Sequence, residues 1–520
     1  MADYNEPYLT LKLNGLNYDT PAYDLPLDVW TDAQNIRFQD GATQKFPGQE
    51  QVFGTLTFDP NWFIPVGYGS LYYWVYADTT GVAVTDMASH FDITPAAGIS
   101  GSIDLDTNWN GDLINNLVVI NNGKENPWWW DGATSNPMTT LPNWPANTTA
   151  EVVRTYKNFL IAMNITDTSV EYPDRVKWSD AAPTGSVPTS WDETDPTGEA
   201  GEYDVADTQG ELVDGLPLGD MFIIYKRDSC YIMQYIGGQF IFQFRKLYDN
   251  VGALAANCIG SIGGSRHLVL TKDDLVVHDG SPARPKSILD DKMRTWLFST
   301  MNATTFRRSY IVEHHAQREM WVCFPSGTSS FADTALIWNY EEDTLGVREM
   351  PLARFAVSGI VDPGDPVDWD SDSQVWDDDL TLWDAGTYSP TAYAMLIGDQ
   401  ENSQFLEADK TNQFDGTNFL AYVTRESMPL LDRRNFKLVK GLYPRMSSTG
   451  NPTVYFRLGT QAQATDAIDW GPEMPFVVGV DDKVDFYSKG RYHSLRCRSE
   501  DDVNWELHSF DFDVELAERW

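Results

Sequence analysis

The residues whose spacing best fits a chemical role are acidic and lie in the segment VDWDSDSQVWDDDLTLWDAG. Asp368, Asp370 and Asp372 match the first three oxygen positions of an EF-hand calcium loop, in which carboxylates at alternate positions surround the ion. Ser373 stands where that loop needs glycine, and Asp379 stands where it needs a closing glutamate. Because of these two departures, we expect the chain to bind no metal and no other cofactor. Calcium binding at the three aspartates is the alternative.

The same segment carries a second pattern. Trp369, Trp376 and Trp383 are seven residues apart, and each is followed by aspartate. A coiled coil is a poor explanation because aspartate and glycine crowd the segment. We expect closely spaced turns in which each aspartate bonds to the backbone and each tryptophan packs inward. This acidic Trp-Asp repeat is expected to form an insertion at residues 365–388.

The common catalytic signatures are missing from the sequence. It has no GxxxxGK[ST] phosphate loop, no HExxH zinc motif and no GxSxG nucleophile elbow. His314 and His315 are adjacent, so on a strand they point to opposite faces and cannot hold one metal together. Carboxylates are too numerous for the sequence to nominate a catalytic pair. We expect no catalytic, cofactor-binding or metal-binding residue, and a chain that is not an enzyme.

The elements that would position any site are short strands. Apolar runs, each followed by a polar turn and a second run, recur 42 to 73 residues apart. A four-stranded propeller blade takes roughly 40–50 residues, and longer intervals fit blades with loop insertions. A set of unrelated hairpins in sandwiches is the alternative. The runs begin at Leu71, Leu117, Phe159, Met221, His267, Met320 and Tyr393.

The pattern predicts an all-β protein of two parts. We place a β-propeller of six or seven blades, with insertions, at residues 51–410, and an extended N-terminal segment at 1–50 for contacts with another subunit or an adaptor. The last stretch, 411–520, alternates cleanly: Val454 and Phe456 fall on one face of a strand, and Tyr455 falls on the other. Several such strands predict a C-terminal antiparallel β-sandwich.

The amino-acid composition indicates which kinds of partner the protein can bind. The 520 residues include 76 acidic and 37 basic side chains, for a formal net charge of −39. Such a surface repels phosphate, so specific binding of duplex DNA is not expected. A need for solubility is enough to explain this charge. The more specific hypothesis is that the acidic surface lines a path along which DNA moves without being bound. The four cysteines lack CxxC spacing and should be buried free thiols, and neither a signal peptide nor a membrane-spanning stretch is found. We therefore expect synthesis and folding in a cytoplasm.

The start of the chain carries a family resemblance. The segment GLNYDTPAYDLPLDVWTDAQNIRFQDGATQKFPG, residues 15–48, resembles the N-terminal segment of tail nozzle proteins of short-tailed bacteriophages, also called tail tubular protein B-like or packaged-DNA stabilisation proteins. The Trp-Asp repeat and the ending GRYHSLRCRSEDDVNWELHSFDFDVEL, residues 490–516, are similar to the same family. The matching residues near the start are Leu25, Pro26, Trp30, Thr31, Asp32, Ala33, Asn35, Ile36, Arg37, Phe38, Asp40, Gly41, Pro47 and Gly48.

The resemblance implies that the protein, although made in the cytoplasm, ends as a component of the virion. It implies a homo-hexameric ring at the distal end of a short tail, assembled in the host cytoplasm, with head-to-tail adaptor proteins and tail fibres as neighbours. This chain is shorter than the long nozzle proteins of some such phages, so we expect it to lack their extra fibre-docking domains. Packaged DNA would be retained by the ring and would pass through its lumen at ejection without specific binding. The structural or interface candidates are Trp30, Asp32, Asn35, Arg37, Phe38, Asp40, Gly41, Trp369, Trp376 and Trp383.

Two other functions stay open at this point. A carbohydrate-binding or depolymerase-type tail propeller could use Trp128, Trp129 and Trp130 to stack on sugar rings if they were exposed. The alternative for these residues is alternating tryptophans in a blade core. A scaffold propeller that binds peptides on its loops is the third hypothesis.

Overall fold

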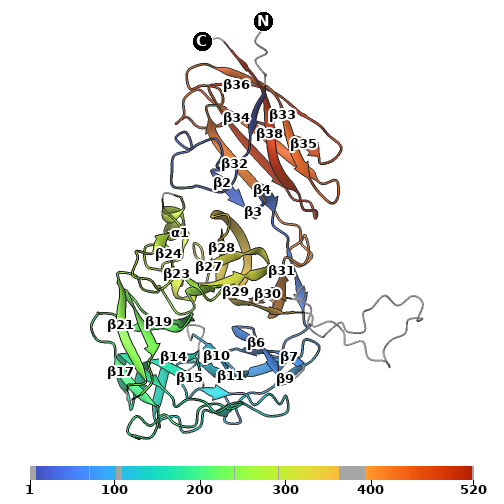
Figure 1. Ribbon diagram of the computed structural model, residues 1–520. Helices are drawn as coiled ribbons and strands as arrows, with labels where there is room; N and C mark the ends of the chain where they lie inside the picture. Colours follow the sequence, from blue (N-terminus) through green and yellow to red (C-terminus); the bar gives the residue numbers. More distant parts are fainter. Residues whose placement is uncertain are drawn as a thin grey trace, which may run out of the picture.

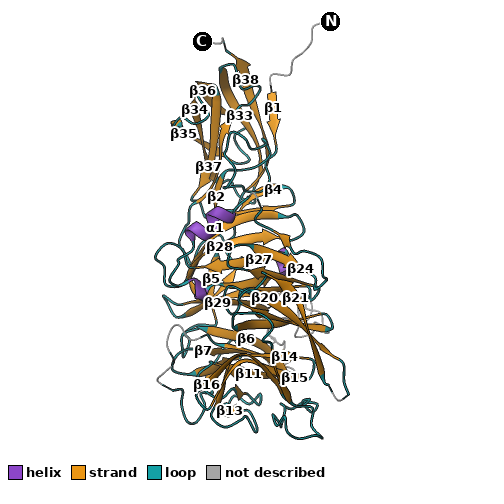
Figure 2. Cartoon of the chain, turned by 90° about the vertical axis from the view of Figure 1, so that its left-hand side faces the viewer, coloured by secondary structure: helices purple, strands orange, loops and turns teal. Residues whose placement is uncertain are grey.

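The computed structural model describes residues 8–68, 71–100, 103, 108–238, 240–290, 292–361 and 393–517. Antiparallel strands form two bodies, a propeller and a sandwich, which are stacked end to end (Figure 1). The described helices are short: α1 (Arg294–Thr300) and the 3-10 turns η1 (Phe306–Arg308) and η2 (His315–Gln317). Figure 2 shows α1 near the level at which the two bodies meet.

Five blades of the propeller are four-stranded sheets whose strands follow each other in sequence. Blade 1 contains β6 (Trp62–Tyr68), β7 (Leu71–Ala77), β8 (Val82–Thr85) and β9 (His90–Asp92). Blade 2 contains β10 (Asn110–Ile114), β11 (Leu117–Asn121), β12 (Trp128–Trp129) and β13 (Thr139–Thr140). Blade 3 contains β14 (Thr148–Tyr156), β15 (Phe159–Asp167), β16 (Val170–Trp178) and β17 (Gly201–Asp204). Blade 4 contains β18 (Leu212–Leu218), β19 (Met221–Lys226), β20 (Ser229–Tyr235) and β21 (Phe242–Asp249). Blade 5 contains β22 (Ile259–Ile262), β23 (Arg266–Leu270), β24 (Leu275–His278) and β25 (Lys286–Ser287).

The last two blades share one long strand. Blade 6 contains β26 (Tyr310–His314), β27 (Glu319–Phe324), β28 (Ala332–Asn339) and the first part of β29 (Thr344–Ile360). A register shift between Ala353 and Ala356 moves β29 into blade 7, where it pairs with β30 (Tyr393–Asp399). Next come β31 (Gln404–Ala408) and β5 (Gln49–Val52), which pair with each other. The N-terminal strand β5 is thus the outer strand of the last blade, and it ties the two ends of the propeller together.

The inner strands close a ring. In cyclic order β6, β10, β14, β18, β22, β26 and the second part of β29 each contact the next, and β29 contacts β6. Buried side chains fill the spaces between blades; Phe63 of blade 1 and Phe405 of blade 7, for example, have ring centroids 4.9 Å apart. The described residues therefore form seven blades, which confirms the predicted propeller.

The seven apolar runs of the sequence are the second strands of the seven blades. Strand β15 is typical: Phe159 through Met163 are all buried although successive side chains point to opposite faces. A neighbouring blade covers each face of such a strand, so both faces need apolar side chains. This is the physical reason that the repeat is readable from the sequence.

The sandwich confirms the other half of the predicted fold. One sheet has the order β2 (Asp32–Gln34), β32 (Ala421–Met428), β37 (Tyr492–Ser499), β34 (Thr453–Gln461) and β35 (Asp469–Val477). The other contains β1 (Tyr8–Leu11), β38 (Glu506–Leu516), β33 (Lys437–Ser447) and β36 (Val484–Gly490). Val454, Phe456 and Leu458 are buried between the sheets, as their alternation predicts.

Residues 1–50 do not form a separate segment where they are described. Strands β1 and β2 belong to the sandwich, and β3 (Ile36–Gln39) and β4 (Ala42–Lys45) lie between it and blade 6. Pairing runs from β29 through β3 and β4 to β38, so one sheet continues from blade 6 into the sandwich (Figure 1). The strands of this segment cover edges within the chain, where their backbone groups are hydrogen-bonded. Its contact with another subunit or an adaptor stays a prediction.

The two bodies share a core. One buried cluster contains Leu268 of blade 5, Val322 of blade 6, Phe38 of β3 and Phe512 of β38. An interface with this continuous apolar packing holds the bodies at a fixed angle, unlike a linker with few contacts. The Trp-Asp repeat at 365–388, with Trp369, Trp376 and Trp383, lies outside the described residues.

Candidate functional site

The predicted residues near the N-terminus meet at one place, the joint between propeller and sandwich. We use the word joint for β2, β3, β4 and the residues of blade 6 and the sandwich that they contact. Trp30 is 1% exposed, its Nε1 donates to Thr43 Oγ1 at 3.0 Å, and its ring lies 6.1 Å from that of Phe510. Phe38 is buried in the shared core. Both aromatic residues therefore pack within the chain.

Asn35 connects the two bodies directly. Its Nδ2 donates to Glu349 Oε2 at 2.9 Å and to the carbonyl oxygen of Leu420 at 2.8 Å, while its Oδ1 accepts from Glu349 N at 2.8 Å. Its φ is 57°, in the left-handed region that asparagine tolerates better than most residues. Asparagine is suited to this position both by its backbone and by its amide.

Asp32 and the turn at Asp40 and Gly41 have polar partners. Asp32 Oδ1 accepts from the Tyr18 hydroxyl at 2.9 Å; burial, and then the Asp32 charge, raise the pKa of Tyr18 above its usual range. Asp40 and Gly41 form the turn from β3 to β4, and their N–H groups donate to the Glu342 carboxylate at 2.5 and 3.4 Å. The turn thus rests on the β28–β29 turn of blade 6.

A buried ionic cluster lies at the centre of the joint. Arg37 Nε donates to Glu319 Oε1 at 2.7 Å, and its Nη2 donates to Asp409 Oδ2 at 2.6 Å. Arg348 Nη1 lies 3.5 Å from Asp409 Oδ1, and His314 Nε2 lies 3.2 Å from Asp409 Oδ2. The two arginines balance the two carboxylates, which is the condition for keeping such charges out of water.

The electrostatics of the cluster follow from its geometry. Burial alone would raise the pKa of Asp409, but Arg37, His314 and Arg348 together hold it well below its usual range. Burial would lower the pKa of Arg37, but Asp409 and Glu319 outweigh burial and raise it. For Arg348 burial prevails and lowers the pKa to about 10. Arg37, Arg348 and Asp409 are therefore charged at neutral pH.

A second charged set ties the inner strands of the propeller together. Arg154 of blade 3 donates to both oxygens of Asp214 of blade 4 at 2.8 Å, to the carbonyl of Gly111 of blade 2 at 3.0 Å, and to Asn257 Oδ1 near blade 5 at 2.9 Å. One guanidinium therefore binds four blades. Burial would lower the pKa of Arg154, but Asp214 raises it. Sequence reasoning missed this set, although a lone charge inside each apolar stretch (VVRTY and LVDGLPL) was a usable signal.

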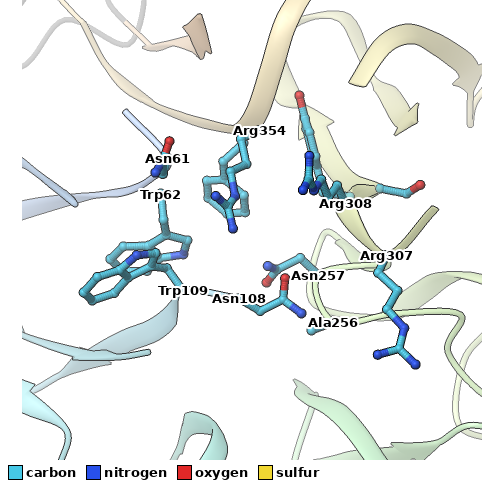
Figure 3. Close-up of a pocket in the computed structure, with 12 residues that line it drawn as sticks. Asn61, Trp62, Asn108, Trp109, Ala256, Asn257, Arg307, Arg308 and Arg354 are labelled. Atoms are coloured by element: carbon cyan, nitrogen blue, oxygen red, sulfur yellow. The ribbon is translucent and has the colours of Figure 1, made fainter. Parts of the chain in front are cut away.

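A small pocket lies at the end of the ring where the inner strands begin. It is lined by Asn61, Trp62, Asn108, Trp109, Ala256, Asn257, Arg307, Arg308, Ser309, Tyr310, Arg354 and Phe355. Figure 3 shows the indoles of Trp62 and Trp109 together on one side, with Arg354 and Asn257 near the middle of the view. Its volume is about 20 Å³, room for one water. Within the described residues Trp109 Nε1 and Asn61 Oδ1 are buried without a hydrogen-bond partner.

Two buried histidines, His267 and His278, are joined by hydrogen bonds through the hydroxyl of Tyr225. His267 Nε2 lies 2.9 Å from the carbonyl of Pro217, which can only accept, so this nitrogen carries the proton. Its Nδ1 then accepts from the Tyr225 hydroxyl at 2.8 Å. Gly280 N donates to His278 Nδ1 at 3.2 Å, so His278 Nε2 donates to the Tyr225 oxygen at 2.7 Å. His267 is 0% and His278 5% exposed, so this hydrogen-bonded set is a core feature closed to substrate.

Other residues considered in the sequence also have clear positions. His314 ends β26 and is buried, whereas His315 begins the 3-10 turn η2 and is exposed. Trp128 and Trp130 are 4% and 1% exposed, which removes them as a platform for sugar rings. Asp368, Asp370 and Asp372 lie outside the described residues. Among the described residues, no group of His, Cys, Asp and Glu is arranged to hold a metal ion.

Comparisons with known proteins add little beyond the fold. No protein-family model matches the chain, and no curated protein matches it. Within the described part of the chain, no helix has the length and apolar character needed to cross a membrane.

Several solved structures are similar in shape. An extracellular domain from B. thetaiotaomicron aligns with a TM-score of 0.41 at 9% identity, over 89% of this chain and 58% of that one. PorZ, a bacterial surface component of the type-IX secretion system of Porphyromonas gingivalis, aligns at 0.35 and 10% identity, over 74% and 43%. The WD40 domain of Neurospora crassa Pan2 aligns at 0.37 and 8% identity, over 71% and 95%. The chain thus spans 58% and 43% of the length of the first two, and at these scores the likeness has no bearing on activity.

Proposed function

We propose that this chain is a non-enzymatic structural protein of a short phage tail, in which six copies form the distal nozzle ring. In this role the ring walls the DNA channel, retains the packaged DNA and passes it at ejection. The head-to-tail adaptor is its neighbour toward the capsid, and tail fibres are a further contact. The protein is made in the host cytoplasm and ends in the virion tail.

One observation carries the proposal. The two stretches that resemble nozzle proteins, residues 15–48 and 490–516, come from opposite ends of the chain and pair within one unit. Thr43 and Gln44 of β4 are opposite Leu507 and Glu506 of β38, and the rings of Trp30 and Phe510 are in contact range. Motifs that co-occur in one sequence and pair in one fold are expected of a shared architecture, whereas chance matches would have no reason to meet.

The mechanical character of the molecule supports the same role. A nozzle must keep its shape while DNA is held under pressure. The outer strand β5 closes the propeller, Arg154 ties four blades, and the joint combines a shared apolar core with balanced buried charges. Each feature raises the cost of opening one part independently of the rest.

The charge of the chain supports the passage of DNA. With a net charge of −39, the surface offers phosphate few cationic contacts, and counterion release on binding is correspondingly small. DNA would move past such a wall without being held at each step. The same charge keeps free subunits apart at low salt, so assembly should be favoured by moderate salt, which screens repulsion.

Electron microscopy tests the proposal. The purified full chain, alone and after mixing with tails that lack it, is imaged at about 0.15 M salt, at which the Debye length is about 8 Å. Six-fold rings, and the same density at the distal end of tails, are the expected result. Particles made without the chain should lose DNA and regain its retention when the chain is supplied. A chain that is monomeric under all conditions and absent from particles would overturn the proposal.

A further inference from the structure

The large apolar side chains that the propeller exposes gather on two sides of the ring. Within the described residues they belong to blades 3 and 4 and to blades 7 and 1, whereas blades 2, 5 and 6 expose none. In the cyclic order of seven blades these two pairs lie opposite each other. Figure 1 shows blades 3 and 4 on the left of the propeller and blades 7 and 1 on the right. Exposed apolar clusters of this kind mark interaction sites.

The first set, here called the blade 3–4 flank, consists of Tyr203, Tyr235, Ile236 and Phe240. Ile236 and Phe240 lie in the turn between β20 and β21 and are 52% and 72% exposed. Tyr203 of β17 stacks on Phe244 of β21 with ring centroids 4.5 Å apart, so the two blades are joined at this surface. Val170 lies at the other end of blade 3 and is not part of the flank. Rings that are already packed lose little conformational freedom when a partner covers them.

The second set, here called the blade 7–1 flank, consists of Tyr68, Leu71 and Tyr393. Tyr68 and Leu71 pair at the turn between β6 and β7, and Tyr393 begins β30. Tyr72 Oη accepts from Ile360 N at 3.3 Å, and Ile360 pairs with Tyr393, so the turns of the two blades lie side by side. These turns follow the first strand of each blade, and the β20–β21 turn follows the third strand of blade 4. In an antiparallel sheet such turns lie at the same end, so both flanks face the same end of the ring.

The charges on the two flanks are complementary. From Tyr231 to Tyr248 the chain has no acidic residue, although 76 of its 520 residues are acidic. Arg245 lies in this stretch, is exposed, and forms no ion pair within the described residues. On the blade 7–1 flank, burial and then the charge of the nearby Glu313 raise the pKa of Tyr393. A cationic flank that faces an acidic one offsets the repulsion between copies that each carry a net charge of −39.

We propose that the blade 3–4 flank of one copy of this chain binds the blade 7–1 flank of the next copy. The two surfaces differ, so the contact is heterologous, and its repetition adds copies until a ring closes. A second copy fits because it presents the matching surface on the opposite side and at the same end of the propeller. Aromatic residues and arginine are the residue types that protein interfaces favour. The inference rests on the proposed ring and names the surfaces through which neighbouring copies meet.

The test measures assembly of the full chain by analytical ultracentrifugation at about 0.15 M salt. One variant, Ile236→Ser with Phe240→Ser, removes the apolar turn of the blade 3–4 flank. The other, Leu71→Ser with Tyr393→Ser, changes the blade 7–1 flank. Serine keeps the net charge at −39, so a loss of assembly cannot come from added repulsion. Thermal melts establish that each variant is folded.

The matched control is Val480→Ser with Tyr487→Ser, because these exposed apolar side chains belong to the sandwich. We expect each flank variant to weaken assembly by about hundredfold, since two large apolar side chains lose their burial and each is worth about tenfold or more. The control should change assembly by less than about twofold. An equimolar mixture of the two flank variants should form pairs and nothing larger, because it offers one intact contact between unlike copies.

Unchanged assembly of either flank variant would overturn the inference, as would a wild-type chain that stays monomeric or a loss of assembly in the control alone. If only the blade 3–4 variant were affected, that flank would bind itself and the heterologous contact would be wrong. The nozzle fails separately. Six-fold rings at tail ends that persist in both flank variants overturn only this contact, whereas flank-dependent oligomers of a chain that is absent from particles overturn only the nozzle.

Discussion

The guanidinium of Arg37 donates two hydrogen bonds to the carboxylate of Glu319, at 2.7 and 3.1 Å, across 282 residues of sequence. Arg37 lies in β3, which leads into the sandwich, and Glu319 begins β27 of blade 6. Glu319 also accepts from Trp321 Nε1 at 3.0 Å, and Arg37 reaches Asp409 just after the last strand pair of blade 7. A single buried pair therefore links the N-terminal motif, a blade and the closure of the propeller.

The first prediction concerns this pair. Arg37→Met should lower the free energy of unfolding by about 3–5 kcal/mol, because Glu319 and Asp409 would stay buried without their main partner. Urea unfolding followed by tryptophan fluorescence measures the change. Arg498→Met is the control: Arg498 pairs with Glu473 and Glu500 at the surface, and its loss should cost less than about 1 kcal/mol.

A double variant sharpens the same prediction. In Arg37→Met with Glu319→Gln, the charge left uncompensated at Glu319 is removed, so the total cost should be smaller than the sum of the two single costs. Additive costs would show that the two side chains stabilise the protein independently of each other.

The second prediction is a dependence of stability on pH. Burial lowers the pKa of His267, His278 and His493 to about 4, whereas an unfolded histidine titrates near 6.5. Between pH 6.5 and 4 the unfolded chain binds protons that the folded chain does not, so stability falls as the pH falls. From pH 7 to 5.5 the expected loss is about 1 kcal/mol for each histidine.

Urea unfolding at several pH values between 7 and 5 measures this slope in a range where most carboxylates stay ionised. His278→Gln should reduce the slope of the unfolding free energy against pH by an amount that corresponds to at most one bound proton. His315→Gln should leave it unchanged, because the His315 side chain is 67% exposed. A flat profile between pH 7 and 5 would contradict the assignment of these histidines as buried and neutral.

The third prediction concerns the strand that closes the propeller. A Cβ atom on Gly48 would lie 1.8 Å from the backbone oxygen of Gln413, so Gly48→Ala must displace the backbone just before β5. We expect faster amide exchange in β5 and β31 and a lower melting temperature. Gly450→Ala is the control, because its Cβ would meet only the two methyl groups of Val503, at 3.2 and 3.6 Å. Unchanged exchange in β5 would mean that the closing strand tolerates this displacement.

The fourth prediction concerns the thiols. Cys230, Cys258, Cys323 and Cys497 are buried and unpaired. Burial raises the pKa of the first three to about 12 and that of Cys497 above its usual value. Because the thiolate is the reactive form, Ellman's reagent at pH 8 should find no rapidly reacting thiol in the native chain and four after unfolding. A fast native thiol would identify a site of local opening.

The sequence by itself determined the repeat and the faces of its strands. The runs at Phe159 and Met221 are second strands of blades, and Val454 and Phe456 are buried, because periodicity and continuous apolar stretches report the local environment of each strand. Asn35 and Arg37, two candidates that the resemblance near the N-terminus implied, both lie at the joint. Their role in contacts with other proteins stays a prediction.

Only the tertiary structure decided which distant segments pair. Nothing local in Gln49–Val52 indicates that this strand completes the blade of β31, and the partners of Arg37 and Arg154 lie 43 to 372 residues away. Backbone pairing is available to any strand edge, and the choice among edges is made by the packing of the whole core, which a pattern within one strand does not encode.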